Sequence, residues 1–150
     1  MSEVLDLSGA KLGQFELLSS GWKDVHVENI DDIMIDNDEG KLPEGTPGYN
    51  VRFVVDGGSE EGKSAFNRFY LPLADSGYDE GKRQTALGRF GDFLVAIGYS
   101  EKDITSGKFK FDKDDAEGRK CRILVGESGG YNTVRNFKPV GGDLEEGGLL

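Results

Sequence analysis

The sequence has little with which to build a disulfide, a metal centre or a catalytic triad. Its 150 residues include one cysteine, Cys121, and one histidine, His26. A lone cysteine excludes a disulfide within the chain and any Cys-x-x-Cys metal motif. A single histidine with no identifiable partner argues against a histidine-based zinc site and against a Ser-His-Asp triad. We therefore expect no metal, no cofactor and no enzymatic activity.

Long apolar runs and an excess of positive charge are also missing. No apolar run approaches the roughly 20 residues that cross a bilayer, and the segment Met1–Asp6 lacks the basic start and apolar core of a signal peptide. The chain has 28 acidic and 18 basic residues, for a formal net charge of −10. This balance excludes a polycationic nucleic-acid binder but not a local basic patch. We expect a soluble cytoplasmic protein without a membrane partner.

Positive charge is concentrated in one segment, residues 119–140. This segment holds five basic residues and one acidic residue, whereas the ten residues after it hold three acids and no base. Surface charge of this kind often only solvates the protein. If the distribution has a function, the basic segment is where an anion would bind.

Short apolar runs separated by many of the 23 glycines predict strands and turns rather than long helices. Alternating apolar and polar residues predict five strands. The expected strands are residues 21–35, 49–55, 65–73, 119–125 and 131–138.

One helix is expected, over residues 83–97, because its apolar residues recur at the spacing of a single helix face. Gly98 supplies the stop signal at its end. Gly88 and Gly91 disfavour a helix by about 1 kcal/mol each, so we expect them to allow close packing on a sheet. A polar connector containing Phe109 and Phe111 follows the helix.

The order of three strands, one helix and two strands predicts an all-β fold with one helix. It is the order of the OB-fold, a five-stranded barrel that binds oligonucleotides on one face. Consecutive βαβ units are absent from the expected elements, which argues against a doubly wound sheet. We divide the chain into an N-terminal extension (1–16), an OB-fold-like domain (17–140) and a flexible acidic tail (141–150).

Residues 57–64, Gly-Gly-Ser-Glu-Glu-Gly-Lys-Ser, match the phosphate-binding pattern GxxxxGK[ST]. A P-loop needs a helix after this string, but an aromatic strand containing Pro72 is expected instead. Glu60 and Glu61 would also place negative charge where phosphates bind. A glycine-rich hairpin loop explains the string, and a nucleotide-binding enzyme acting through Lys63 is the weakest alternative.

Strand alternation places rings and cations together on an outward face. If Phe69 faces the core, then Phe66, Arg68 and Tyr70 face outward, beside Arg52 of the preceding strand. Single-stranded nucleic acid needs such a surface, because bases stack on rings and cations follow the phosphates. The alternative is that the rings belong to the core.

We expect ten residues to bind nucleic acid, on the basis of this strand-face argument. The expected phosphate-binding residues are Arg52, Arg68, Arg122, Arg135 and Lys138, and the expected base-stacking residues are Trp22, Phe66, Tyr70, Tyr131 and Phe137.

Several short segments together resemble one protein family. They are Gly21-Trp22 with the Val25/Val27 strand, Asn50–Val55, Arg68-Phe69, Ala96-Ile97-Gly98, Gly118–Val125 and Tyr131–Phe137. In these segments the chain is similar to small bacteriophage proteins that resemble single-stranded-DNA-binding proteins. The resemblance covers about residues 17–140.

The resemblance implies a protein of phage replication or recombination, in the cytoplasm of an infected bacterium, that coats single-stranded DNA through an OB-like domain without strong sequence preference. Proteins of this kind often recruit replication or recombination partners through an acidic tail. Asp143, Glu145 and Glu146 make the tail acidic here, but it is short and ends in Leu149-Leu150 rather than an aromatic residue.

A second function class stays open, namely an OB-like module that binds a phage or host protein and no nucleic acid. The sequence also leaves the oligomeric state open, a homo-oligomer included.

Overall fold

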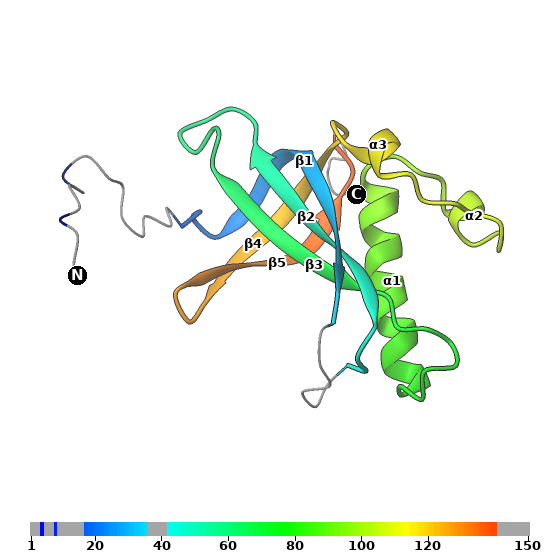
Figure 1. Cartoon of the computed structure of the whole chain (residues 1–150). Helices are drawn as coiled ribbons and strands as arrows, with labels where there is room; N and C mark the ends of the chain where they lie inside the picture. Colours follow the sequence, from blue (N-terminus) through cyan, green and yellow to red (C-terminus); the bar gives the residue numbers. More distant parts are fainter. Residues whose placement is uncertain (1–3, 5–7, 9–16, 36–41, 141–150) are drawn as a thin grey trace.

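In the computed structural model, five strands form one antiparallel sheet and a single long helix runs beside it (Figure 1). The structure describes Val4, Ser8 and residues 17–35 and 42–140. The acidic tail lies outside the described residues, as does the N-terminal extension apart from Val4 and Ser8. In the described ranges, no helix combines the length and apolar character needed to cross a membrane.

The expected order of three strands, a helix and two strands is confirmed. The strands are β1 (Gly21–Met34), β2 (Pro47–Val55), β3 (Ser64–Tyr70), β4 (Lys120–Ser128) and β5 (Tyr131–Lys138), and the helices are α1 (Glu80–Ala96), α2 (Glu101–Ile104) and α3 (Lys113–Ala116). The two short helices lie in the expected polar connector. Each begins after a side-chain cap, because Ser100 and Asp112 accept hydrogen bonds from backbone N–H groups of α2 and α3.

The strands are ordered β3-β2-β1-β4-β5, and every neighbouring pair is antiparallel. β1, which is 14 residues long, is central because it pairs with both β2 and β4. Its first part pairs with β4 and its later part with β2. β3 and β5 are therefore the edges of the sheet, and within the described residues no strand pairing joins them. The expected OB-fold-like five-stranded barrel is therefore not shown by the strand pairing.

The side chain of Arg89, on α1, spans the gap between these edges. Its guanidinium donates hydrogen bonds to the Asn67 side chain on β3 and to the Val134 carbonyl on β5. It also lies over the rings of Phe69 and Phe137. The helix thus connects the two edges through a half-buried cation rather than through a strand ladder.

Two β-bulges change which residues face the core. Glu28 is the extra residue in β1, and Arg135 is the extra residue in β5. Because Arg135 interrupts the alternation of β5, Val134 and Phe137 both face inward, at 7% exposure each. Simple alternation placed Phe137 on the same side as Arg135, and that prediction is wrong.

The core lies between the inner face of the sheet and α1, and aromatic rings fill it. Ring centroids lie between 5.1 and 6.1 Å apart in the contacts of this cluster. Its members are Phe53, Phe69, Phe90, Phe93 and Phe137. The cluster fixes α1 against β3 and β5, which leaves the other face of the sheet to solvent.

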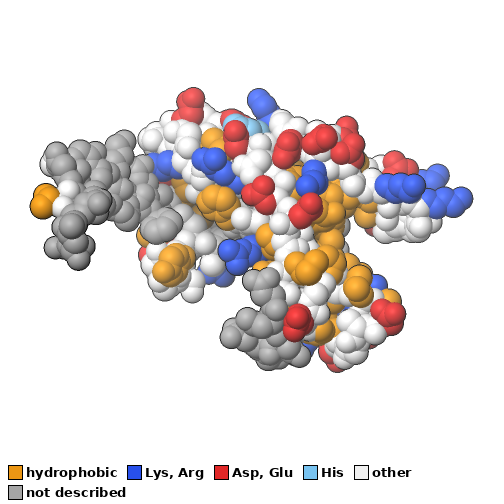
Figure 2. All heavy atoms as spheres, viewed as in Figure 1, with side chains coloured by type: hydrophobic (Ala, Val, Ile, Leu, Met, Phe, Trp, Pro, Cys, Tyr) orange, Lys and Arg blue, Asp and Glu red, His pale blue; other side chains and the backbone are white. Residues whose placement is uncertain are grey.

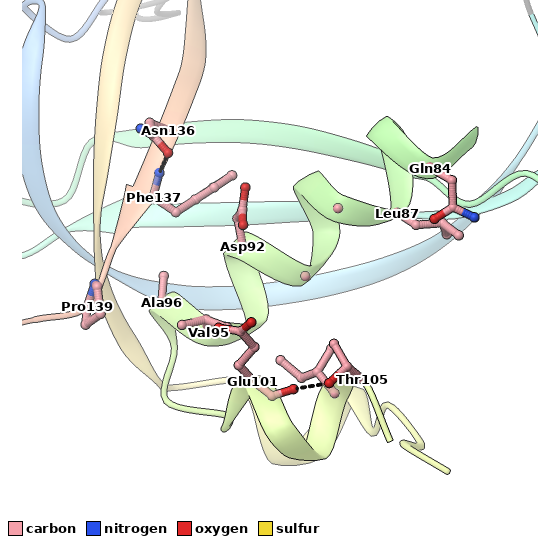
Figure 3. Close-up of a pocket in the computed structure, with 13 residues that line it drawn as sticks. Gln84, Leu87, Asp92, Val95, Ala96, Glu101, Thr105, Asn136, Phe137 and Pro139 are labelled. Carbon is pink, nitrogen blue, oxygen red and sulfur yellow. Dashed lines mark hydrogen bonds between the residues drawn. The ribbon is translucent and has the colours of Figure 1, made fainter. Parts of the chain in front are cut away.

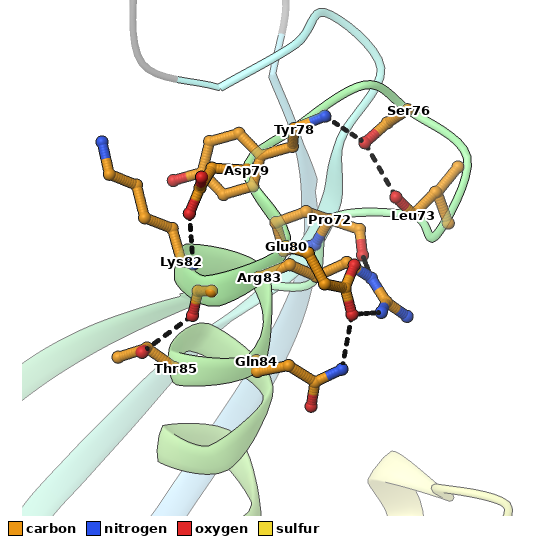
Figure 4. A network of polar contacts seen from close by, with 11 residues as sticks. Pro72, Leu73, Ser76, Tyr78, Asp79, Glu80, Lys82, Arg83, Gln84 and Thr85 are labelled. Carbon is orange, nitrogen blue, oxygen red and sulfur yellow. Dashed lines mark hydrogen bonds and ion pairs between the residues drawn. The ribbon is translucent and has the colours of Figure 1, made fainter.

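The start of α1 is held by a network of polar contacts (Figure 4). Asp79 caps the helix, because its Oδ2 accepts a hydrogen bond from Lys82 N at 2.9 Å. Arg83 Nε donates to the carbonyl of Pro72 at 2.9 Å, and Arg83 Nη1 pairs with Glu80 at 3.1 Å. These contacts tie the helix to the chain that leaves β3.

Candidate nucleic-acid interface

The outward face of β2 and β3 carries the residues that alternation predicted there. Val51 and Phe53 are buried, and Arg52 between them points to the other face. On β3, Phe69 is buried, whereas Phe66 is 54% exposed and Arg68 is exposed. Arg52 lies directly opposite Phe66 in the strand ladder. The sheet therefore presents a ring flanked by guanidinium groups.

Tyr70 lies at the end of this face, against Gly48 on β2. The two residues are paired in the ladder. A Cβ atom at Gly48 would lie 3.1 Å from Cδ1 of Tyr70 and 2.3 Å from the carbonyl oxygen of Phe69. Only glycine lets the ring and the backbone approach this closely. Gly48 thereby sets the position of the Tyr70 ring.

The two arginines of this face differ in their bonding. Arg52 Nε donates a hydrogen bond to Ser64 Oγ at 3.0 Å, which orients its side chain along the strands. Arg68 makes no side-chain hydrogen bond or ion pair with any residue that the structure describes. Its guanidinium is therefore available to an anion without first breaking a contact within the protein.

A second group of predicted residues lies over β1, β4 and β5. Lys138 Nζ is 4.4 Å from the centre of the Trp22 ring, a cation–π contact. Arg122, opposite Lys138 in the ladder, forms an ion pair with Asp24 at 2.8 Å. A phosphate at Arg122 would have to compete with that carboxylate.

The other predicted residues of β5 have separate positions. Tyr131 starts the strand at the β4–β5 turn and is 66% exposed. The exposed Arg135 side chain lies over Gly126, where a Cβ atom would be 2.1 Å from Arg135 Nε. The buried Phe137 ring packs among core aromatics and has no open face for a base, so it is removed from the candidate interface.

His26 lies on the outward face between the two groups, which sequence reasoning missed because no partner was identifiable. Its ladder neighbours are Val54 and Lys120. Its Nδ1 is 2.7 Å from Asp56 Oδ1, and its Nε2 is 2.8 Å from Glu28 Oε1. These hydrogen bonds, first to Glu28 and then to Asp56, raise the pKa of His26. The bulge at Glu28 and the end of β2 bring the carboxylates together, and neither has a sequence signature.

The P-loop-like segment forms the hairpin between β2 and β3, as expected. β3 begins at Ser64, where a P-loop would begin its helix. Glu60 bonds to Lys23 at 2.6 Å and accepts a hydrogen bond from Ser19 N at 2.8 Å. These contacts lower the pKa of Glu60 to about 2. The loop thus holds a carboxylate against the start of β1, where it would oppose a phosphate.

Charge on the surface is mixed. On the side of the molecule that faces the viewer, Figure 2 shows acidic and basic side chains interspersed rather than one continuous basic surface. The described outward face therefore offers local cation–ring groups within an acidic protein. Comparison with known proteins found no matching family model and no matching curated protein.

Proposed function

We propose that this protein binds single-stranded DNA, with little dependence on base sequence, on the outward face of β2 and β3. The observation that carries the proposal is the neighbouring pair on β3, the exposed Phe66 ring and Arg68, whose side chain has no partner in the described part of the chain. A base stacked on such a ring contributes roughly 1–3 kcal/mol, and a cation beside it neutralises phosphate. Arg52 and Tyr70 extend this surface.

We further propose that the sheet is an OB-like barrel. The strand order supports this, because it brings β3 and β5 to the two edges, and Arg89 bonds to both. In OB-folds, oligonucleotides bind on strands 2 and 3 and on the loops between strands 1–2 and 4–5. Phe66 and Arg68 lie on β3, and Tyr131 lies beside the β4–β5 turn. The proposed face thus corresponds to the face on which OB-folds bind oligonucleotides.

The second group extends the path across β1 to β4 and β5. Trp22 offers a ring and Lys138 a cation in contact with it. Arg122 and Arg135 supply further positive charge. We propose that this activity serves phage replication or recombination, as the resemblance to phage proteins implies. The net charge of −10 opposes long-range attraction to DNA, so the proposed affinity is modest and falls as salt rises.

Two substitutions with matched controls test the proposal. Binding of a labelled oligodeoxythymidine of about thirty bases is followed by fluorescence anisotropy for Phe66→Ala and Arg68→Ala. Each variant should bind about tenfold more weakly than the wild type. Leu73→Ala is the apolar control, because Leu73 is as exposed as Phe66, at 54%. Lys102→Ala, on the exposed face of α2, is the cationic control.

The controls should bind like the wild type. If all four variants bind DNA equally, the face is not the binding site. If folded wild-type protein binds no DNA at low salt, the alternative function, a module that docks a protein partner, replaces the proposal. Tyr70→Ala is a further test of the face, because it removes a second ring from it and should also weaken DNA binding.

A further inference from the structure

A groove of about 730 Å³ lies between α1, α2 and the end of β5. It is separate from the outward face of the sheet. Figure 3 shows its lining residues along one side of α1, with α2 and the end of β5 on either side. The half-buried side chains of Leu87, Val95 and Ile104 make its walls partly apolar. The groove therefore offers both apolar surface and room.

Two glycines of α1 open the groove. A Cβ atom at Gly88 or Gly91 would meet no atom within 4 Å. The expectation that these glycines pack on the sheet is wrong, because both line the groove instead. Glycine inside a helix lowers helix stability by about 1 kcal/mol relative to alanine. The space beside these two glycines is not occupied by any other part of the described fold. The space allows another backbone to approach the helix closely.

The charge of the groove has one sign. Its charged lining residues are Asp92 on α1 and Glu101 on α2. Both are exposed, and neither carboxylate has a hydrogen bond or ion pair with a described residue, although the Arg89 guanidinium attracts Asp92 at longer range. No lysine or arginine is among the lining residues. An occupant with positive charge would therefore gain from both carboxylates, whereas an acidic occupant would be repelled.

We propose that this groove docks a short basic amphipathic helix of a partner protein. The helix would place apolar side chains on Leu87, Val95 and Ile104, and lysine or arginine beside Asp92 and Glu101. The lining positions of α1 run from residue 84 to residue 96, which corresponds to roughly 18 Å of helix, the length of about twelve residues. The surface therefore matches three turns of a docked helix.

The two ends of the chain do not match this chemistry, since residues 1–16 hold three acids and one base. The tail that follows Val140 carries Asp143, Glu145 and Glu146 and no base. A second copy of the chain has a formal net charge of −10, and its basic residues 119–140 lie mainly on the strands β4 and β5 rather than on a helix. Repulsion between like charges disfavours the tail and a second copy as occupants of an acidic groove. We therefore infer that the occupant is a basic partner.

The test uses a labelled model peptide of about fourteen residues, built from leucine and lysine in a helical amphipathic pattern, and fluorescence anisotropy with the full chain. The peptide should bind the wild type. Gly91→Leu fills the groove, and Asp92→Asn with Glu101→Gln removes its charge, so each should weaken binding by about tenfold or more. Gly91→Leu keeps the fold, because leucine favours a helix more than glycine does, and its melting temperature should rise.

Matched controls separate docking from general attraction to an acidic protein. Thr85→Leu adds leucine to α1 outside the groove, and Glu44→Gln with Glu127→Gln removes two distant exposed charges. Both should bind like the wild type, and the same peptide with glutamate in place of lysine should not bind. The proposal is overturned if the controls weaken binding as much as the groove variants, if the groove variants have no effect, or if no peptide binds at low salt. It is also overturned if sedimentation shows a dimer that Gly91→Leu abolishes, because the occupant is then a second copy.

Discussion

Arg89 Nη2 on α1 donates a hydrogen bond to Asn67 Oδ1 on β3 at 2.8 Å. The same guanidinium donates to the carbonyls of Val134 and Arg135 on β5. Burial lowers the pKa of Arg89, because partial removal of the guanidinium from water disfavours its charged form. The contact shows how the helix joins two strands that do not pair with each other.

Arg89→Met should lower the free energy of unfolding by about 2–4 kcal/mol, because it leaves the Val134 carbonyl and Asn67 without a donor. Asn67 Nδ2 has no hydrogen-bond partner among the described residues, so the substitution would also remove the hydrogen bond that its Oδ1 accepts from Arg89. Lys82→Met is the control, since it removes an exposed cation from the same helix. Urea unfolding measures both variants, and equal midpoints for Arg89→Met and the wild type would contradict this role.

Two phenylalanines that sequence reasoning treated alike should behave differently. Phe137→Ala should cost about 3–5 kcal/mol of stability, because its ring lies in the aromatic core. Phe66→Ala should change stability by no more than about 0.5 kcal/mol, because Phe66 is on the surface. Urea unfolding distinguishes them. A similar loss in both variants would show that Phe66 supports the fold rather than a ligand.

The strands and faces could be predicted because they depend on local alternation. Val51 and Phe53 inward with Arg52 outward follow directly from a period of two, and the confirmed exposure of Phe66 and Arg68 has the same origin. Alternation holds wherever a strand pairs without interruption.

Three features could not be predicted, because they depend on contacts between distant parts of the chain. The bulge at Arg135 reverses the face of Phe137, and only pairing with β4 reveals it. The pairing of His26 with Asp56 joins residues 30 positions apart. Gly88 and Gly91 were expected to face the sheet, but larger residues of α1 occupy that side. Tertiary packing decided each of these.

The link between Glu60, Ser19 and Lys23 should make stability depend on acid pH. The pKa of Glu60 is lowered from 4.5 to about 2, first by the Lys23 hydrogen bond. A lowered pKa means that this contribution is complete above pH 4.5 and is lost as the pH falls toward 2. Urea unfolding across this range should show a smaller acid loss for Glu60→Gln than for the wild type. The neighbouring Glu61→Gln should keep the wild-type slope, and an unchanged slope in Glu60→Gln would contradict the assignment.

His26 should act in the opposite direction. Its pKa is raised by hydrogen bonds to Glu28 and Asp56, so the folded protein holds the proton more tightly than the unfolded chain. This contribution is complete below the ordinary value of 6.5 and is lost as the pH rises through the folded pKa. His26→Gln should therefore reduce the fall in stability as the pH rises above 6.5. Equal changes in the wild type and the variant, measured by urea unfolding, would rule this out.

The central claim is that the sheet binds single-stranded DNA, and titration of the unmodified protein tests it most directly. Anisotropy of a labelled oligodeoxythymidine of about thirty bases is measured at about 50 mM and 200 mM salt, with a duplex of the same length as control. The account predicts binding to the single strand that weakens clearly at the higher salt, and much weaker binding to the duplex. Equal binding to both forms, or no binding of the single strand at the lower salt by folded protein, would contradict it.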